Sequence, residues 1–182
     1  DEAAAIIRQR LMGQVFAVSA QIVAEEICSM EDVDRGAKVG LRWARGPFEI
    51  ANRLGISEAV SMAKSYANLA EFNLPNWFAE LTEPLEFNYV DTHVEGEVAT
   101  VRINRPEAMN ALNEIVIEQL GKVLDSLNSS DDIKTIVLDG AGKAFVAGAD
   151  VKFFVDKIQG DAIPDIYEFT AHGHEVMNKL EN

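Results

Sequence analysis

The 182-residue chain carries 30 acidic side chains against 16 lysines and arginines, which gives a net charge of −14 and a pI of about 4.5. Such a balance argues against a nucleic-acid-binding or anionic-membrane-binding protein. The 48% hydrophobic content is enough for globular cores. The single Cys28 excludes an internal disulfide and suits a reducing, cytoplasmic setting. No apolar run has the length of a membrane span, and no signal peptide is recognisable.

The first 83 residues predict an all-helical domain. Helical spacing over residues 3 to 28 predicts a long amphipathic helix, and Glu25-Glu26 lie near its far end. The expected core face of that helix consists of Ile7, Leu11, Val15, Val18, Ile22 and Ile27. Ser29 is a good N-cap for a second, shorter helix. Pro47 suits the first position of a third helix, which Gly55 ends, and Ser57 starts a fourth.

A change of hydrophobic period marks a domain boundary at Thr82-Glu-Pro-Leu85. We therefore expect one domain over residues 1–83 and another over residues 84–182. Residues 87–94 and 97–103 predict paired strands that turn at Glu95-Gly96. Asn113 is expected to cap a helix, and the β-branched run over residues 133–138 predicts a buried strand.

The run Lys143-Ala-Phe-Val-Ala-Gly-Ala-Asp-Val-Lys152 follows that strand and leads into a helix expected over residues 151–158. Gly148 and the flanking alanines let main-chain N–H groups approach a ligand closely. Donors at a helix start lack intrahelical partners and lie at the positive end of the helix dipole. The turn is therefore suited to an oxygen that gains negative charge during a reaction. A plain strand-to-helix connection would use similar residues.

A second run lies upstream, at Asn104-Arg-Pro-Glu-Ala-Met-Asn-Ala-Leu-Asn113. In order and spacing the two runs resemble the crotonase (enoyl-CoA hydratase/isomerase) superfamily, over roughly Leu85 to Asn182. The resemblance implies the fold class α + α/β, with an all-helical domain followed by a truncated crotonase-like ββα spiral. It also implies that the N–H of Ala149 is one donor of an oxyanion hole. The second donor and two catalytic glutamates would lie beyond residue 182, so we expect this chain alone to be catalytically incomplete.

The same resemblance implies a path for coenzyme A, formed largely by main-chain atoms. Its residues would be Ala108, Met109, Ala111, Ala147, Asp150, Val151 and Lys152. Lys152 could add a cationic contact to a CoA phosphate, whereas Glu107 stands where the family often has lysine. Core packing explains each alanine equally well, and Asp150 could simply cap a helix.

The helical half has its own resemblance, carried by residues 31–55 and their Arg45-Gly-Pro-Phe48 turn. This stretch is similar to the C-terminal helical domain of 3-hydroxyacyl-CoA dehydrogenases. The family's Asn-Arg pair aligns with Gln9 and Arg10, so the active-site asparagine is missing. The resemblance implies a non-catalytic copy of that domain, with NAD belonging to a nicotinamide-binding domain that this chain lacks and no cofactor bound by this segment. A simple four-helix packing unit would explain the same residues.

Taken together, the two resemblances imply part of a bifunctional enzyme of fatty acid β-oxidation or related acyl-CoA metabolism. It would hydrate trans-2-enoyl-CoA and oxidise the 3-hydroxyacyl-CoA product with NAD. Both ends of the chain indicate a segment of a longer polypeptide, and exposed apolar edges would favour a homo-oligomer.

Three alternatives within the superfamily stay open: an isomerase, a dehalogenase and a thioesterase. A non-catalytic acyl-CoA-binding or assembly module is a further possibility. No metal site is expected, because His172 and His174 lie two residues apart in a helical pattern and do not share a face.

Overall fold

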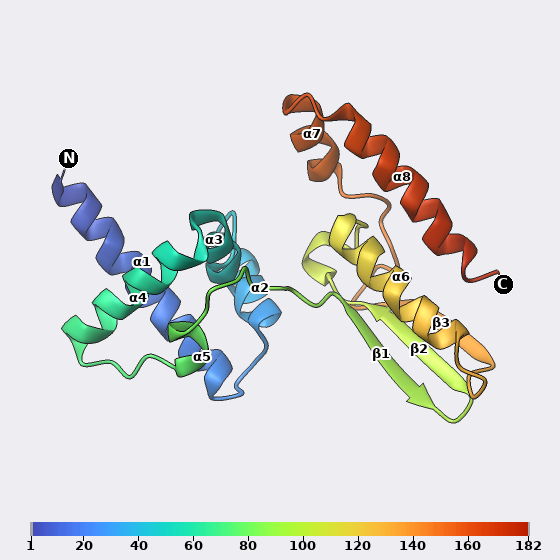
Figure 1. The fold of residues 1–182 in the computed structure, drawn as a ribbon, viewed down its shortest axis with the longest axis horizontal. Helices are drawn as coiled ribbons and strands as arrows, with labels where there is room; N and C mark the ends of the chain where they lie inside the picture. Colours follow the sequence, from blue (N-terminus) through green and yellow to red (C-terminus); the bar gives the residue numbers. More distant parts are fainter. Residues whose placement is uncertain (1, 182) are drawn as a thin grey trace. The chain divides into compact units, whose positions relative to one another are not determined.

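The computed structural model describes residues 2–181 (Figure 1). The chain divides after Phe87 into two compact units. Within the described residues, no helix has the length and apolar character needed to cross a membrane.

The first unit is all-helical, as predicted. Its helices are α1 (Glu2–Ala24), α2 (Met30–Gly40), α3 (Pro47–Leu54), α4 (Ile56–Ala70) and the short α5 (Asn76–Ala79). Ser29 caps α2 by accepting the N–H of Asp32 at 3.1 Å. Pro47 is the first residue of α3, where its missing N–H does no harm, and Gly55 ends that helix with φ +96°. These sequence signals therefore identified the helix ends correctly.

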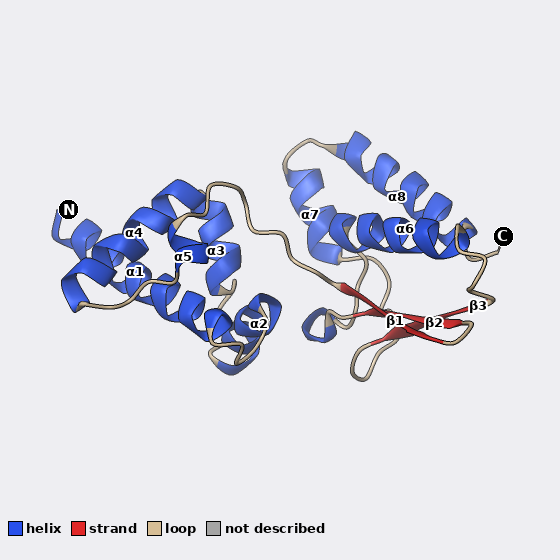
Figure 2. Ribbon diagram, turned by 60° about the horizontal axis from the view of Figure 1, so that its bottom comes forward, coloured by secondary structure: helices blue, strands red, loops and turns tan. Residues whose placement is uncertain are grey.

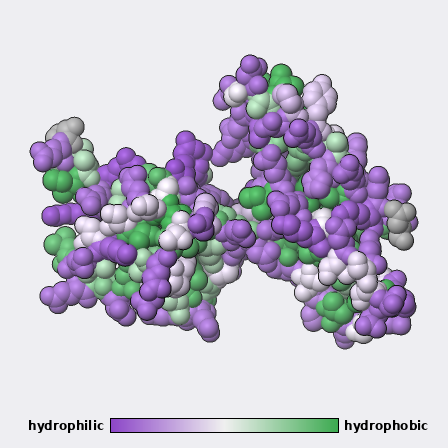
Figure 3. Space-filling model, viewed as in Figure 1, coloured by the Kyte–Doolittle hydropathy of each residue, from purple (hydrophilic) through white to green (hydrophobic). Residues whose placement is uncertain are grey.

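The prediction of which face of α1 is buried was wrong. Ile7, Leu11 and Ile27 are 58%, 59% and 65% exposed, and Ile27 lies beyond the end of the helix. The buried residues of α1 are instead Gly13, Phe16, Ala17, Ser19 and Ala20. Figure 3 shows apolar surface on this unit.

A close approach of two backbones explains the difference. Helix α1 packs along α4 (Figure 1), and a Cβ added to Gly13 would lie 2.3 Å from the carbonyl oxygen of Met62. Small residues let the helices come together at this distance, so α1 turns its small residues inward, while Ile7, Leu11 and Val18 stay exposed and Val15 and Ile22 are half-buried. Phe16 fills the end of the seam, where it stacks on Phe78.

Helix α3 is capped by a residue from another helix. Its N-cap position is Gly46, which has no side chain to accept the free N–H groups. The carboxylate of Asp34 in α2 accepts the N–H of Phe48 and the N–H of Glu49, both at 2.8 Å. A Cβ on Gly46 would lie 2.2 Å from the Asp34 carboxyl carbon, so glycine makes room for this cap. The two helices are thus joined through one buried carboxylate.

The second unit contains a three-stranded sheet of order β1-β2-β3 (Figure 2). Its elements are β1 (Val90–Glu95), β2 (Val98–Ile103), the 3-10 turn η1 (Pro106–Ala108), α6 (Glu114–Asn128), β3 (Thr135–Gly140), α7 (Val151–Gln159) and α8 (Ile163–Asn178). β1 and β2 form the predicted antiparallel hairpin, and β2 pairs in parallel with β3. The parallel pair requires a crossover, which α6 supplies.

Helix α6 lies between the sheet and α8 in Figure 2. Asn113 caps it by accepting the N–H of Val116 at 3.0 Å, as predicted. A Cβ on Gly121 would lie 3.1 Å from the buried Val176, so α8 packs closely on this helix. The core of the unit is formed mainly by α6 and β2.

The expectation of a fully buried third strand was wrong. No residue of β3 is buried, and Val137 is 44% exposed. Among residues 2–181, β2 is the only strand that pairs with β3, so the apolar run of β3 is partly accessible at a sheet edge. A β-branched composition indicates a strand, but it does not tell how many layers cover that strand.

Asp34 makes the stability of the helical unit depend on pH. Burial raises the pKa of Asp34 from 3.8 to about 6, although the N–H groups of Phe48 and Glu49 oppose this shift. Between these two values the folded state binds more protons than the unfolded state, so the free energy of unfolding should fall as pH rises from 4 to 6. We expect a fall on the order of 3 kcal/mol. Urea unfolding followed by tryptophan fluorescence measures it, because Trp43 and Trp77 both lie in this unit. Asp34→Asn should lack this slope; equal slopes in both proteins would contradict the assignment.

The seam between α1 and α4 gives a second prediction. Gly13→Ala places a methyl group against the Met62 carbonyl, and we expect it to destabilise the helical unit by about 1–3 kcal/mol. Gly36→Ala is the matched control, because a Cβ there meets nothing within 4 Å in the middle of α2. It should be neutral or stabilising, since alanine favours helix more than glycine does. Similar losses in both variants, measured by urea unfolding, would argue against close packing at Gly13.

Candidate active site

The two sequence runs singled out above meet at one edge of the sheet. β2 ends at Ile103 and β3 ends at Gly140, and these two residues are paired in the parallel register. The carboxyl ends of parallel strands lie at the same edge, so the loops that follow them are neighbours. The loop after β2 covers residues 104–112 (the upstream loop), and the loop after β3 covers residues 141–150 (the downstream loop). This edge of the sheet is the candidate site.

Main-chain hydrogen bonds join the two loops. Leu112 donates its N–H to the carbonyl of Gly148 at 2.9 Å, and Asp150 donates its N–H to the carbonyl of Leu112 at 2.8 Å. A third bond runs from the N–H of Ala147 to the carbonyl of Met109 at 3.1 Å. Leu112 and Ala149 are paired as in a parallel sheet. These bonds bring the predicted site residues of both loops side by side.

This pairing determines the direction of the Ala149 N–H. In a trans peptide the N–H points opposite to the C=O of the preceding residue, and the described chain has no cis peptide. The carbonyl of Gly148 points to Leu112, so the N–H of Ala149 points away from it. Gly148 has φ +95°, and a Cβ on it would meet nothing within 4 Å. The backbone here needs glycine for its conformation and faces open space.

Asn110 is the buried centre of the upstream loop. Asn110 is fully buried, and its backbone has a φ of +56°, a left-handed conformation that asparagine tolerates. The amide nitrogen donates to the carbonyls of Ala141 and Ala144 at 2.8 and 2.7 Å. The amide oxygen accepts the N–H of Arg105 at 2.8 Å. One side chain therefore fixes both loops and satisfies three partly buried main-chain groups.

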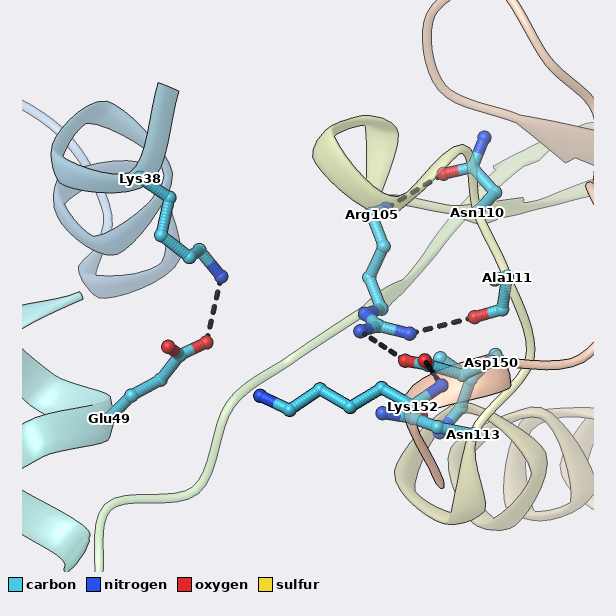
Figure 4. A network of polar contacts seen from close by, with 9 residues as sticks. Lys38, Glu49, Arg105, Asn110, Ala111, Asn113, Asp150 and Lys152 are labelled. Atoms are coloured by element: carbon cyan, nitrogen blue, oxygen red, sulfur yellow. Dashed lines mark hydrogen bonds and ion pairs between the residues drawn. The ribbon is translucent and has the colours of Figure 1, made fainter. Parts of the chain in front are cut away.

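Arg105 and Asp150 form a second link between the loops (Figure 4). The guanidinium donates to the carbonyl of Ala111 at 2.7 Å and to the carboxylate of Asp150 at 3.2 Å. It also lies over the ring of Tyr89, 5.3 Å from the ring centroid. Only 12% of the Arg105 side chain is exposed, and its Nε has no partner among residues 2–181. This cation is thus held mostly out of water beside one carboxylate.

Helix α7 begins directly after the downstream loop. Asp150 is its N-cap and accepts the N–H of Lys152 at 3.1 Å, so the alternative that Asp150 caps a helix is confirmed. Val151 is 73% exposed and Lys152 is also exposed. A cation in the first turn opposes the helix dipole, so Lys152 does not stabilise the helix by its charge.

The exposure of the predicted CoA-binding residues also bears on the core-packing alternative. Met109 is 61% exposed, Ala147 is exposed, and Ala108, Ala111 and Ala149 are half-buried. None of these alanines belongs to the buried core, which leaves their surfaces within reach of a ligand. The described residues contain no cluster of three or more His, Cys, Asp or Glu side chains suited to a metal ion.

Sequence reasoning missed Asn110 and Arg105 as organising residues, although both lie in the run that it singled out. Their partners, Ala141, Ala144 and Asp150, are about 30 to 45 residues away. The available signal was an Asn in a loop, a residue type that tolerates a left-handed conformation. A local pattern could not identify what that side chain would bind.

The role of Asn110 can be tested by Asn110→Ala. The change removes a buried side chain and leaves two carbonyls and one N–H, all partly buried, without this partner, and we expect a loss of about 2–4 kcal/mol in the free energy of unfolding of the second unit. Hydrogen exchange of the β2 amides measures it. Asn128→Ala is the control, because that exposed side chain makes a single bond, to the carbonyl of Lys179, and should cost less than about 1 kcal/mol. Equal effects would contradict the central role of Asn110.

Two family models match consecutive parts of this chain. Residues 7–89 match the C-terminal domain of 3-hydroxyacyl-CoA dehydrogenase, and residues 98–182 match enoyl-CoA hydratase/isomerase. Each match corresponds to one of the two units seen in the structure.

Individual relatives are similar to part of this chain. A short-chain-enoyl-CoA hydratase of Clostridium acetobutylicum is 36% identical over 100 residues, which cover 53% of this chain and 36% of the relative. A crotonyl-CoA hydratase of Syntrophomonas wolfei is 34% identical over 88 residues, covering 48% and 32%. The structure of an enoyl-CoA hydratase from Bacillus anthracis is 25% identical with a TM-score of 0.48, covering 52% and 36%. The chain spans about a third of the length of these relatives. The chain thus consists of a segment of the 3-hydroxyacyl-CoA dehydrogenase C-terminal type followed by a segment of the enoyl-CoA hydratase/isomerase type.

Proposed function

We propose that residues 88–181 bind an acyl-CoA thioester at the carboxyl edge of the sheet, with the N–H of Ala149 directed at the thioester oxygen. The single observation that carries this proposal is the pairing of Gly148 with Leu112, which turns the N–H of Ala149 away from Leu112. In the hydration of a 2-enoyl thioester, negative charge builds on that oxygen. A preoriented N–H donor stabilises this charge, and loss of one such donor lowers the rate by about 10²–10³ in other enzymes.

We place the coenzyme A moiety along the two loops. Ala108, Met109, Ala111 and residues 147–150 are exposed or half-buried, and most of them carry small side chains that leave room for the ligand. Lys152 supplies a cation within the first turn of α7 for a phosphate of the ligand. CoA is here a substrate moiety and not a resident cofactor.

We further propose that the chain belongs to an enzyme that hydrates trans-2-enoyl-CoA and oxidises the 3-hydroxyacyl-CoA product with NAD, in a reducing cytoplasm. The hydratase part is supported by relatives named as enoyl-CoA and crotonyl-CoA hydratases. The dehydrogenase part is supported by the match of residues 7–89 alone. In this view the helical unit is a packing domain, since Gln9 and Arg10 stand in the place of the family's Asn-Arg pair. Assembly into a homo-oligomer would cover the exposed apolar residues of β3, α7 and α8.

Binding of a thioester to residues 1–182 tests the proposal directly. Butyryl-CoA, which cannot be hydrated, should shift the ¹⁵N–¹H resonance of Ala149 along with those of the upstream loop. CoA without an acyl group should shift the upstream loop and Lys152 but not Ala149. If millimolar butyryl-CoA leaves the Ala149 resonance in place, the donor is misassigned. Crotonyl-CoA hydration by a longer polypeptide containing these residues, and not by residues 1–182 alone, would then assign the chemistry.

A further inference from the structure

Asp150 presents an electrostatic problem for the proposed site, on which the following inference rests. It is the residue directly after the proposed oxyanion donor, and its carboxylate caps α7. A carboxylate is a good cap for a helix N-terminus. In the proposed complex it would also be a full negative charge on the residue next to the donor that holds the substrate oxygen. Two such charges repel each other, most strongly in a site from which water is excluded.

Arg105 lies where it can cancel this charge. Its guanidinium contacts the Asp150 carboxylate at 3.2 Å, and the two side chains are only 12% and 22% exposed. The same guanidinium is oriented by the Ala111 carbonyl and the Tyr89 ring, while its Nε has no partner among the described residues. The guanidinium thus leaves part of its own hydrogen-bonding capacity unused, so hydrogen bonding by itself does not explain why an arginine lies here. The described structure gives it one anionic partner, Asp150.

We propose that Arg105 is a positioning residue that neutralises Asp150, so that an acidic helix cap can stand beside the oxyanion donor without repelling the substrate oxygen. Three main-chain bonds and Asn110 already join the two loops, so a purely mechanical clamp at this place would be redundant. The charge is what the guanidinium adds. Arg105 does not itself touch the thioester.

If Arg105 neutralises Asp150, its variants should bind butyryl-CoA in a different order of affinity than if Arg105 only joins the two loops mechanically. Relative to a neutral pair, Arg105→Ala leaves a net charge of about −1 at the cap, Asp150→Asn leaves about +1, and the double variant restores neutrality. We expect Arg105→Ala to bind about tenfold more weakly than the wild-type chain, and Asp150→Asn to bind more tightly. The double variant should recover most of the loss, and Arg105→Lys should stay within about threefold of the wild type. Asparagine also caps helices, so α7 should persist in both Asp150 variants.

The measurement is the affinity of residues 1–182 for [1-¹³C]butyryl-CoA together with the ¹³C shift of the bound thioester carbonyl. The shift reports polarisation by the Ala149 N–H and would not follow the charge order if Arg105 were only structural. A clamp predicts that Arg105→Ala, Asp150→Asn and the double variant all lose affinity alike, and that result overturns the inference. If Arg105→Ala does not fold, weaker binding by Asp150→Asn alone is enough to overturn it, and tighter binding supports it.

Failure of the two proposals can be told apart. If wild-type residues 1–182 bind no butyryl-CoA or leave its carbonyl shift unchanged, the proposed function fails and the inference fails with it. If the wild-type carbonyl shifts but the variants do not follow the charge order, only the role of Arg105 is overturned.

Discussion

The hydrogen bonding between the upstream and downstream loops is the constraint on which the candidate site depends. Parallel pairing of β2 with β3 brings the two loops to one edge, and the bonds of Leu112 to Gly148 and Asp150 then fix the direction of the Ala149 N–H. Peptide planarity leaves no freedom for that N–H once the Gly148 carbonyl is bound. A flexible turn of the same composition would have no preferred donor direction.

Asn110 and Arg105 secure this arrangement in different ways. Asn110 is fully buried and satisfies main-chain groups of both loops, so it acts on the position of the backbone. Arg105 brings a charge beside the acidic cap of α7, so it acts on the electrostatic potential around the turn. Polar groups shielded from water are costly to leave unpaired. Because the Asn110 side chain pairs with three main-chain groups, movement of either loop would break those hydrogen bonds. Figure 4 shows Arg105 reaching from the upstream loop to Asp150, and Asn110 accepting the N–H of Arg105.

In the helical unit, too, side chains of one element form hydrogen bonds with the backbone of another. Asp34 caps a helix other than its own, and Gly46 leaves the space that the carboxylate occupies. Asn52 similarly exchanges two hydrogen bonds of 2.8 Å with the main chain of Leu85, so the predicted linker residue is held by α3. In each case a side chain from one element satisfies the backbone of another. Such pairs connect short helices that could not be stable separately.

The sequence by itself determined what depends on neighbours along the chain. Ser29, Pro47 and Asn113 marked helix starts correctly, because caps are local chemistry. The hairpin was also predicted, but its turn lies at Gly96-Glu97, one residue later than the predicted Glu95-Gly96, because Glu95 still pairs with Val98. The two runs that form the candidate site were also recognisable from residue type and spacing.

Tertiary structure alone decided which surfaces meet. Helix α1 carries an aliphatic stripe and a small-residue stripe, and only its close approach to α4 selects the small one for burial. The exposure of β3 depends on having one strand neighbour, and the partners of Asn110 and Arg105 lie too far along the chain for any local pattern to identify. Hydrophobic periodicity and propensity describe single elements, whereas burial and long-range hydrogen bonds are properties of pairs of elements.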